Sequence, residues 1–392
     1  MRSFGMEEEL LVDARSGLPR AVAGAVLAAA DRHDWQPGRH ERGHRMEKEL
    51  QREKLECATR PVTRTGELQE AIRHWCREAA RHAETAGAMV AAIAAAPLPV
   101  RPLLNAGRRY AWMGEQFGLT AQEQLTRGCH VHVAVESDEE AVAFLGRIRP
   151  WLSVPTAISA NSPYWQGENR GYASYRSRVW NGWPCAGPVD VFGSADHCHE
   201  QVAAMVGPGV LRDRGMIYFD ARPAAVHPTV EIRVTDPCPD STAPVLPAAL
   251  TPGLVETAAR AWRDGRPPDR VGTSLLRPAS WRAGRSGLDG PPPHPRTMRE
   301  TSPRQAVGAL HRHVREARVD HGADDPVREG IASLERHANG ASTRRRLLRD
   351  EGGPARMVTP CAELTTDGEN TSGQAKTPLP GDDTHDRAER TV

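Results

Sequence analysis

The chain has 392 residues and a formal net charge of +1, with 51 basic and 50 acidic residues. This balance supplies no overall field that would attract nucleic acid or a membrane surface, so it favours small-molecule partners. Seven scattered cysteines, never spaced as Cys-x-x-Cys, argue against a disulfide framework and a zinc knuckle. No signal-peptide pattern and no apolar run of about 18 residues occurs, so we expect a cytoplasmic protein without a membrane partner.

Hydrophobic periodicity predicts the main elements of a mixed fold. Short β-like runs occur at 4–13, 129–135, 215–220 and 229–235, and we expect strands there. The run 65–87 carries apolar residues at helical spacing and ends at a glycine, so we expect a helix of about six turns. The small-residue run 88–97 follows as a buried strand. The pattern alone leaves both α+β and α/β open.

The C-terminal third divides into scaffold and tail. Two or three helices with basic last turns are expected between residues 303 and 349. Residues 366–392 are polar and nearly free of large apolar side chains, so they cannot repay the entropy of ordering. We therefore predict one domain over residues 1–365 and a disordered tail over 366–392.

Three predicted strands carry ionisable side chains two residues apart, which project from one face of a strand. The pairs are Glu7 with Glu9, His130 with His132, and Glu231 with Arg233. Taken singly, a Glu-x-Glu strand suits an exposed face, and a His-x-His strand suits either a polar surface or a metal site. Continuous apolar residues back all three pairs, so the strands are expected to be central, where unpaired charge is costly. Divalent cations and a phosphate would neutralise such a set.

An acidic element, KELQREKLECAT, precedes the long helix. Glu49 and Glu56 are seven residues apart, a spacing that returns to the same helix face after two turns, and Glu53 lies near that face too. The alternative is a solvated helix with Glu/Lys pairs.

An aromatic and polar segment spans residues 157–194, where glycines and prolines preclude one regular element. Long loops of this kind are usually functional, and an aromatic wall with directed polar groups suits an amino acid or a nucleotide. An aromatic minicore beneath a loop is the alternative.

Several of these stretches, in this order, resemble the type 2 glutamate-cysteine ligase family of carboxylate-amine ligases. The stretches are FGMEEELLVD, KELQREKLECAT, GCHVHVAV, SANSPYWQGENRGYASYRSRVW with WPCAGP and FGS, and PTVEIRVTD. The resemblance extends from about Phe4 to Leu364. It implies an α+β fold related to glutamine synthetase, in which a curved, mainly antiparallel sheet flanked by helices holds the active site on its concave face.

The resemblance also implies a chemistry and a set of site residues. ATP would phosphorylate a γ-carboxylate and an amine would then displace phosphate, with glutamate and cysteine as the expected substrate pair. Two or three Mg²⁺ ions are implied, with Mn²⁺ as an alternative, and a homodimer is compatible with the family. One ion would be held by Glu7, Glu49 and Glu56, another by Glu9, His130 and Glu231. Arg233 would hold the transferred phosphoryl group and Arg176 a phosphate or the substrate carboxylate. Candidates for the substrate pocket are Thr59, Asn161, Trp165, Tyr172, Ser174 and His132, the last of which could instead orient a metal ligand.

The sequence departs from the family pattern in loops, at Glu168-Asn169-Arg170, at Cys185, and at Pro237-Cys238-Pro239. These departures leave phosphoryl transfer in place and open the choice of amine, for example a non-cysteine amine in specialised metabolism. Two readings of other classes are a metal-dependent amidohydrolase, for which the sequence lacks a lysine between Lys54 and Lys376, and a non-catalytic binding protein.

Overall fold

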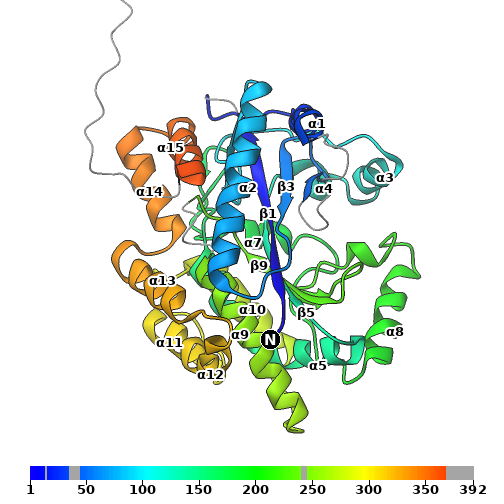
Figure 1. The fold of residues 1–392 in the computed structure, drawn as a ribbon. Helices are drawn as coiled ribbons and strands as arrows, with labels where there is room; N and C mark the ends of the chain where they lie inside the picture. Colours follow the sequence, from blue (N-terminus) through cyan, green and yellow to red (C-terminus); the bar gives the residue numbers. More distant parts are fainter. Residues whose placement is uncertain (14–15, 35–44, 240–244, 368–392) are drawn as a thin grey trace, which may run out of the picture.

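The computed structural model describes residues 1–13, 16–34, 45–239 and 245–367 (Figure 1). Seven strands form one sheet, in the order β2-β3-β1-β5-β9-β8, with β4 also paired to β1. Every pairing in it is antiparallel. Its strands are β1 (Phe4–Asp13), β2 (Arg45–Lys48), β3 (Lys54–Ala58), β4 (Met89–Ala91), β5 (Cys129–Ala134), β8 (Ala221–Pro223) and β9 (Thr229–Thr235). The hairpin of β6 (Tyr164–Trp165) and β7 (Glu168–Asn169) lies apart from it.

Strand β1 is the central strand of the sheet. Its residues pair with β3 on one side, and with β5 and then β4 on the other. Met6, Leu10 and Val12 on β1 are 2% exposed or less and belong to the apolar core. Because side chains alternate along a strand, the intervening residues Glu7 and Glu9 project from the opposite face.

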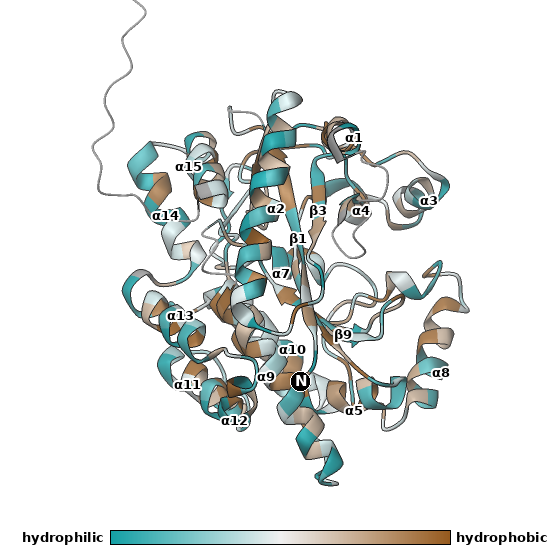
Figure 2. Cartoon of the chain, viewed as in Figure 1, coloured by the Kyte–Doolittle hydropathy of each residue, from teal (hydrophilic) through white to brown (hydrophobic). Residues whose placement is uncertain are grey.

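Helix α2 (Thr65–Thr85) lies across β1 and covers the apolar face of the sheet (Figure 1). Its buried residues Leu68, Ile72 and Cys76 recur at helical spacing, and Figure 2 shows hydrophilic and hydrophobic residues alternating around this helix. Glu8 of β1 points into this layer and accepts a hydrogen bond from the Cys76 thiol at 3.7 Å. Burial raises the pKa of Glu8 to about 7, so the apolar layer accommodates this carboxyl best in its neutral form.

The remaining helices surround the sheet. In chain order they are α1 (Ala23–Asp34), α3 (Arg108–Phe117), α4 (Leu119–Glu123), α5 (Asp138–Ile148), η1 (Arg149–Trp151), α6 (Ser153–Ser159), α7 (Tyr175–Trp180), α8 (Ala195–Val206), η2 (Arg214–Met216), α9 (Val245–Arg263), α10 (Thr273–Ser286), α11 (Pro303–His313), α12 (Arg315–Val319), α13 (Asp324–His337), α14 (Gly340–Glu351) and α15 (Pro354–Asp367). Helices α11, α12 and α13 pack on α9, and α15 packs on α2 and β4. Within the described ranges, no helix is long and apolar enough to cross a membrane.

The fold class expected from the family resemblance is confirmed, since helices surround an antiparallel sheet. The predicted strands at 4–13, 129–135 and 229–235 and the helix at 65–87 are confirmed. The strand predicted over 215–220 is wrong, because η2 and irregular backbone occupy it. Four helices stand where two or three were expected between 303 and 349, and only Met89–Ala91 of the run 88–97 is a strand. Residues 366 and 367 of the predicted tail lie in α15, and its residues from 368 onward lie outside the described ranges.

The last turn of α11 predicts a pH-dependent stability. His313 stacks on Trp151 with ring centroids 3.9 Å apart, and burial, followed by the charge of Arg296, lowers the pKa of His313 from 6.5 to about 4. As pH falls, His313 takes up a proton in the unfolded chain before it does so in the folded protein. The contribution of neutral His313 to stability is therefore present above pH 6.5 and is lost as the pH falls through about 4.

We expect His313→Phe, which keeps a ring against Trp151 but cannot titrate, to remove this loss. The free energy of unfolding of each protein is measured by urea denaturation at pH 7 and at pH 4. On going from pH 7 to pH 4, the value for the wild type should fall by about 2 kcal/mol more than the value for the variant. A difference between the two proteins that does not change with pH would contradict this account.

Candidate active site

A cavity of about 420 Å³ lies over the polar face of the sheet. Strands β1, β2, β3, β5, β8 and β9 contribute its floor, and α3, α7 and the loop 215–218 add Tyr110, Met113, Trp180 and Tyr218. Its acidic lining residues are Glu7, Glu9, Glu47, Glu49, Glu56 and Glu231, and its basic ones are Lys54, Arg109, Arg222 and Arg233, with His130, His132 and His227. The three strand pairs singled out in the sequence therefore meet in one cavity.

Strand register gathers the carboxylates. Glu56 on β3 is the direct partner of Glu9 on β1 and of Glu47 on β2, so three glutamates form a row across three strands. Like charges directly opposite one another on a sheet are destabilising. Accordingly, burial and then the nearby carboxylate of Glu49 raise the pKa of Glu56 well above its usual value. A proton, a basic side chain or a bound cation can reduce the negative charge of this row.

The acidic element between β2 and β3 is a hairpin rather than the expected helix. Glu49 lies in the turn after β2 and Glu56 lies within β3. The two residues meet because the chain doubles back, and not because a helix repeats its face after two turns. Glu53, expected near the same face, is instead buried and accepts a hydrogen bond from the backbone N–H of Leu103 at 3.1 Å.

One possible metal-binding group consists of Glu9, Glu49 and Glu56, each of which offers a carboxylate oxygen within 4.8 Å of the others. The two oxygens of Glu9 also have donors from the chain. The Lys54 ammonium lies 2.8 Å from Oε1, and the Gly128 backbone N–H donates to Oε2. Burial alone would raise the pKa of Glu9, but the charge of Lys54 and then of His130 lowers it.

A second group consists of Glu7, His132 and Glu231, whose ligand atoms also lie within 4.8 Å of one another. His132 Nε2 is 3.3 Å from a Glu7 oxygen, and its Nδ1 is 2.9 Å from the Thr229 hydroxyl. His130 Nδ1 lies 3.6 Å from Glu7 and 3.5 Å from Glu231. Burial would raise the pKa of Glu7, but hydrogen bonds with His130 and His132 hold it well below its usual range.

The two groups differ from the expected sharing of ligands. The family resemblance implies Glu7 with Glu49 and Glu56, and Glu9 with His130 and Glu231. In the structure Glu9 lies with Glu49 and Glu56, whereas Glu7 lies with His132 and Glu231. The buried Nε2 of His130 has no hydrogen-bond partner among the described residues. Carboxylate oxygens gathered from separate strands are the ligands that Mg²⁺ and Mn²⁺ prefer, so the residues present fit divalent ions.

Two arginines hold Glu231 from opposite sides. The Arg222 Nε donates to one carboxylate oxygen at 2.6 Å, and Arg233 Nη1 pairs with the other. Burial would raise the pKa of Glu231, but the charges of Arg233 and Arg222 lower it to about 2. The register of β5 against β9 shifts by one residue beside Arg233, and such a bulge re-aims side chains. Glu231 and Arg233 both line the cavity.

Arg176 lies beneath the cavity lining rather than in it. Its side chain is buried, Nη2 donates to the Arg233 carbonyl at 3.1 Å, and Nη1 lies 3.8 Å from Asp236. The guanidinium groups of Arg176 and Arg233 both lie over the Trp180 ring, at 5.6 and 5.3 Å from its centroid. These contacts suit a residue that positions Arg233, and a direct contact with substrate is not supported.

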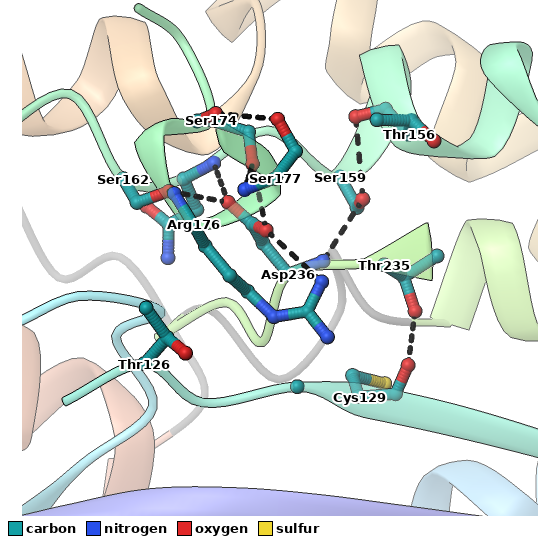
Figure 3. Close-up of polar contacts among 12 residues, drawn as sticks. Thr126, Cys129, Thr156, Ser159, Ser162, Ser174, Arg176, Ser177, Thr235 and Asp236 are labelled. Carbon is teal, nitrogen blue, oxygen red and sulfur yellow. Dashed lines mark hydrogen bonds and ion pairs between the residues drawn. The ribbon is translucent and has the colours of Figure 1, made fainter. Parts of the chain in front are cut away.

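Asp236 is the centre of a buried polar network that holds this arginine (Figure 3). It accepts hydrogen bonds from the Ser162 and Ser174 hydroxyls at 2.8 and 2.9 Å and from the Asn161 backbone N–H at 2.9 Å. The Asn161 amide donates to the Pro237 carbonyl at 2.7 Å. Asn161 and Ser174, expected in the substrate pocket, thus bind the residues that directly follow β9.

Of the other expected pocket residues, His132 lines the cavity, whereas Thr59, Trp165 and Tyr172 lie away from its lining. Thr59 accepts a hydrogen bond from the Met6 backbone N–H through its hydroxyl at 2.9 Å. Trp165 and Tyr172 pack on Tyr175, with ring centroids 5.6 and 5.4 Å apart. This part of the aromatic segment matches the minicore alternative, and only its later tryptophans, Trp180 and Trp183, reach the cavity.

Sequence reasoning missed Lys54, Arg222, Asp236 and Gly128 as site residues. Lys54 lies two residues before Glu56, and a strand reading of that segment would have put both on one face. Arg222 carried no motif, because β8 is only three residues long. Asp236 directly follows the Glu-x-Arg strand, a signal that could have been used.

The glycine before the His-x-His strand predicts a steric requirement. A Cβ at Gly128 would lie 2.5 Å from both Arg176 Nη2 and His130 Nε2, while its N–H holds Glu9. We expect Gly128→Ala to lower the free energy of unfolding by about 2 kcal/mol, because both buried side chains must move.

Gly66→Ala provides the matched control, because a Cβ there meets nothing within 4 Å and Gly66 lies in the first turn of α2. It should leave stability unchanged or slightly raised. Guanidinium denaturation of both variants is the measurement, and equal stability of the two would refute the steric requirement.

Comparisons with known proteins identify the family of the chain. Residues 3–363 match the family model described as glutamate-cysteine ligase family 2. A Streptomyces avermitilis protein named "Putative glutamate--cysteine ligase 2-1" is 51% identical over 93% of this chain and 99% of its own length. A Streptomyces coelicolor protein named "Putative glutamate--cysteine ligase 2" is 48% identical over the same shares.

Solved structures share the fold at low sequence identity. The glutamate–cysteine ligase of Francisella tularensis in complex with AMP superposes with a TM-score of 0.66 at 11% identity, over 93% of this chain and 89% of that one. A bifunctional glutathione synthetase from Pasteurella multocida gives a TM-score of 0.62 at 12% identity, over 93% and 52% of the two chains. With the whole sheet and its cavity inside the matched residues, the chain belongs to glutamate-cysteine ligase family 2.

Proposed function

We propose that this ligase joins the γ-carboxylate of L-glutamate to the amine of L-cysteine, with ATP converted to ADP and phosphate. Membership of glutamate-cysteine ligase family 2 supports the reaction class. The observation that carries the proposal is the gathering of six glutamates and four basic side chains around one cavity over the polar face of the sheet. Such a set suits a phosphorylated, metal-bound nucleotide better than an uncharged ligand.

The chemistry requires activation of a carboxylate, because attack by an amine on a carboxylate would otherwise expel an oxide. Transfer of the γ-phosphoryl group to the glutamate γ-oxygen forms an acyl phosphate and releases ADP. The amine nitrogen then attacks the carbonyl carbon, phosphate leaves, and the amine loses a proton. Catalysis of such transfers is chiefly positioning and charge stabilisation.

Arg233 and Arg222 are the residues proposed to meet the transferred phosphoryl oxygens. Both line the cavity, and Glu231 fixes both guanidinium groups through its two oxygens. A planar guanidinium matches two phosphoryl oxygens at once. Arg176, held by Asp236 and bonded to the Arg233 carbonyl, is proposed to keep the Arg233 backbone in place.

The carboxylate groups of the floor are proposed to hold two or three magnesium ions, with manganese as an alternative. Glu9, Glu49 and Glu56 would form one site, and Glu7, His132 and Glu231, with His130 beside them, would form another. Bound magnesium would offset the negative charge that phosphoryl oxygens carry during transfer. The aromatic rings of Trp180, Trp183, Tyr110 and Tyr218 would border the organic part of the substrates.

The test is ADP release by purified protein with ATP, magnesium, glutamate and cysteine. We expect turnover with this pair, and a loss of about a hundredfold or more in kcat for Glu231→Gln, because both arginines lose their fixed position. Glu329→Gln is the control, since that exposed residue of α13 lies far from the cavity lining.

The outcome also separates the other readings. Turnover with glutamate and a different amine would keep the chemistry and change the acceptor. ATP-independent hydrolysis would favour the amidohydrolase, and binding without turnover by any pair would favour a non-catalytic protein. Either of these last two results would refute the proposed ligase reaction.

A further inference from the structure

Lys54 is an unusual residue for its position. Three of the 51 basic residues of the chain are lysines, and the remainder are arginines. Of these lysines, Lys48 is exposed on β2, whereas Lys54 is 5% exposed at the start of β3. Long basic side chains are rarely buried unless a partner compensates their charge. A lysine buried at the floor of the cavity therefore needs a specific reason.

The contacts of Lys54 are with the proposed metal ligands themselves. Its Nζ lies 2.8 Å from Glu9 Oε1 and 3.8 Å from Glu49 Oε2. Both glutamates belong to the group that they form with Glu56, in which the offered oxygens lie within 4.8 Å of one another. The ammonium is thus next to the group that a divalent cation would occupy.

An ammonium suits this position better than a guanidinium. It is a compact point charge with rotatable donors, whereas the guanidinium is a planar fork that needs room for its whole plane. The single positive charge of the ammonium offsets part of the negative charge that the three glutamates can carry, and the rest is left for a divalent ion to balance. Lys54 thereby reduces the repulsion among the three carboxylates when no metal ion is bound, and it also reduces their attraction for a metal ion.

The backbone closes the other side of the same carboxylate. The Gly128 N–H donates to Glu9 Oε2, so both oxygens of Glu9 already have donors from the chain. A cation that binds through Glu9 must share it with Lys54. The two positive charges would lie a few ångströms apart, where their repulsion is large even at an effective dielectric constant of about 20.

We propose that Lys54 is a resident counter-ion of the Glu9, Glu49 and Glu56 group, which limits the affinity of the nucleotide-free protein for a divalent cation at that site. This inference rests on the metal-binding role in the proposed function. It assigns to Lys54 a positioning and charge-balancing role and no direct part in bond formation.

The test is Mn²⁺ binding to the purified full chain without nucleotide or amino acids, followed by the electron paramagnetic resonance of free Mn²⁺. We expect Lys54→Met to bind Mn²⁺ with an affinity about tenfold higher or more, because a like charge has been removed from beside the ion. Lys48→Met makes the same chemical change at an exposed position and should bind as the wild type does.

A second readout guards against a folding defect. In EDTA, Lys54→Met should melt at a lower temperature than the wild type, and Mn²⁺ should raise its melting temperature by more than it raises that of the wild type. Lys54→Gln keeps a hydrogen-bond donor for Glu9 without the charge, and it should also bind Mn²⁺ more tightly. Wild-type or weaker Mn²⁺ affinity in both Lys54 variants would overturn the proposal. No substrate is present, so this result is independent of whether glutamate and cysteine are joined.

Discussion

The structure depends on one constraint, which is that carboxylates stand directly opposite one another across buried strands. Glu56 faces Glu9 on one side and Glu47 on the other, and no apolar packing can offset such repulsion. The chain supplies part of the compensation through Lys54, Arg222 and Arg233. The proposed divalent ions would add positive charge beside the same carboxylates.

Supporting layers on both faces hold this floor in register. On the reverse face α2 packs on β1, where burial raises the pKa of Glu8 to about 7. Under the cavity, Asp236 gathers the hydroxyls of Ser162 and Ser174 and pairs with Arg176. Residues far apart in the sequence thus fix Arg176, which in turn donates a hydrogen bond to the Arg233 carbonyl of β9.

The sequence predicted the central strands and their polar faces well, because a two-residue period backed by apolar residues is a strong local signal. The hairpin before α2 was misread as a helix, since a spacing of seven residues brings Glu49 and Glu56 together on either element. The expected pocket residues Asn161 and Ser174 were found under the cavity instead. A sequence motif does not distinguish residues that contact the substrate from residues that position those contacting residues. The hydrogen bonds of Asn161 and Ser174 around Asp236 are seen only in the structure.

The central claim is that divalent cations are held on this sheet face. Anomalous diffraction from crystals grown with Mn²⁺ and a non-hydrolysable ATP analogue tests it most directly. The account predicts manganese peaks within ligand distance of the Glu9, Glu49 and Glu56 oxygens and beside Glu7 and Glu231. Manganese peaks found only outside this cavity, with nucleotide bound, would contradict it.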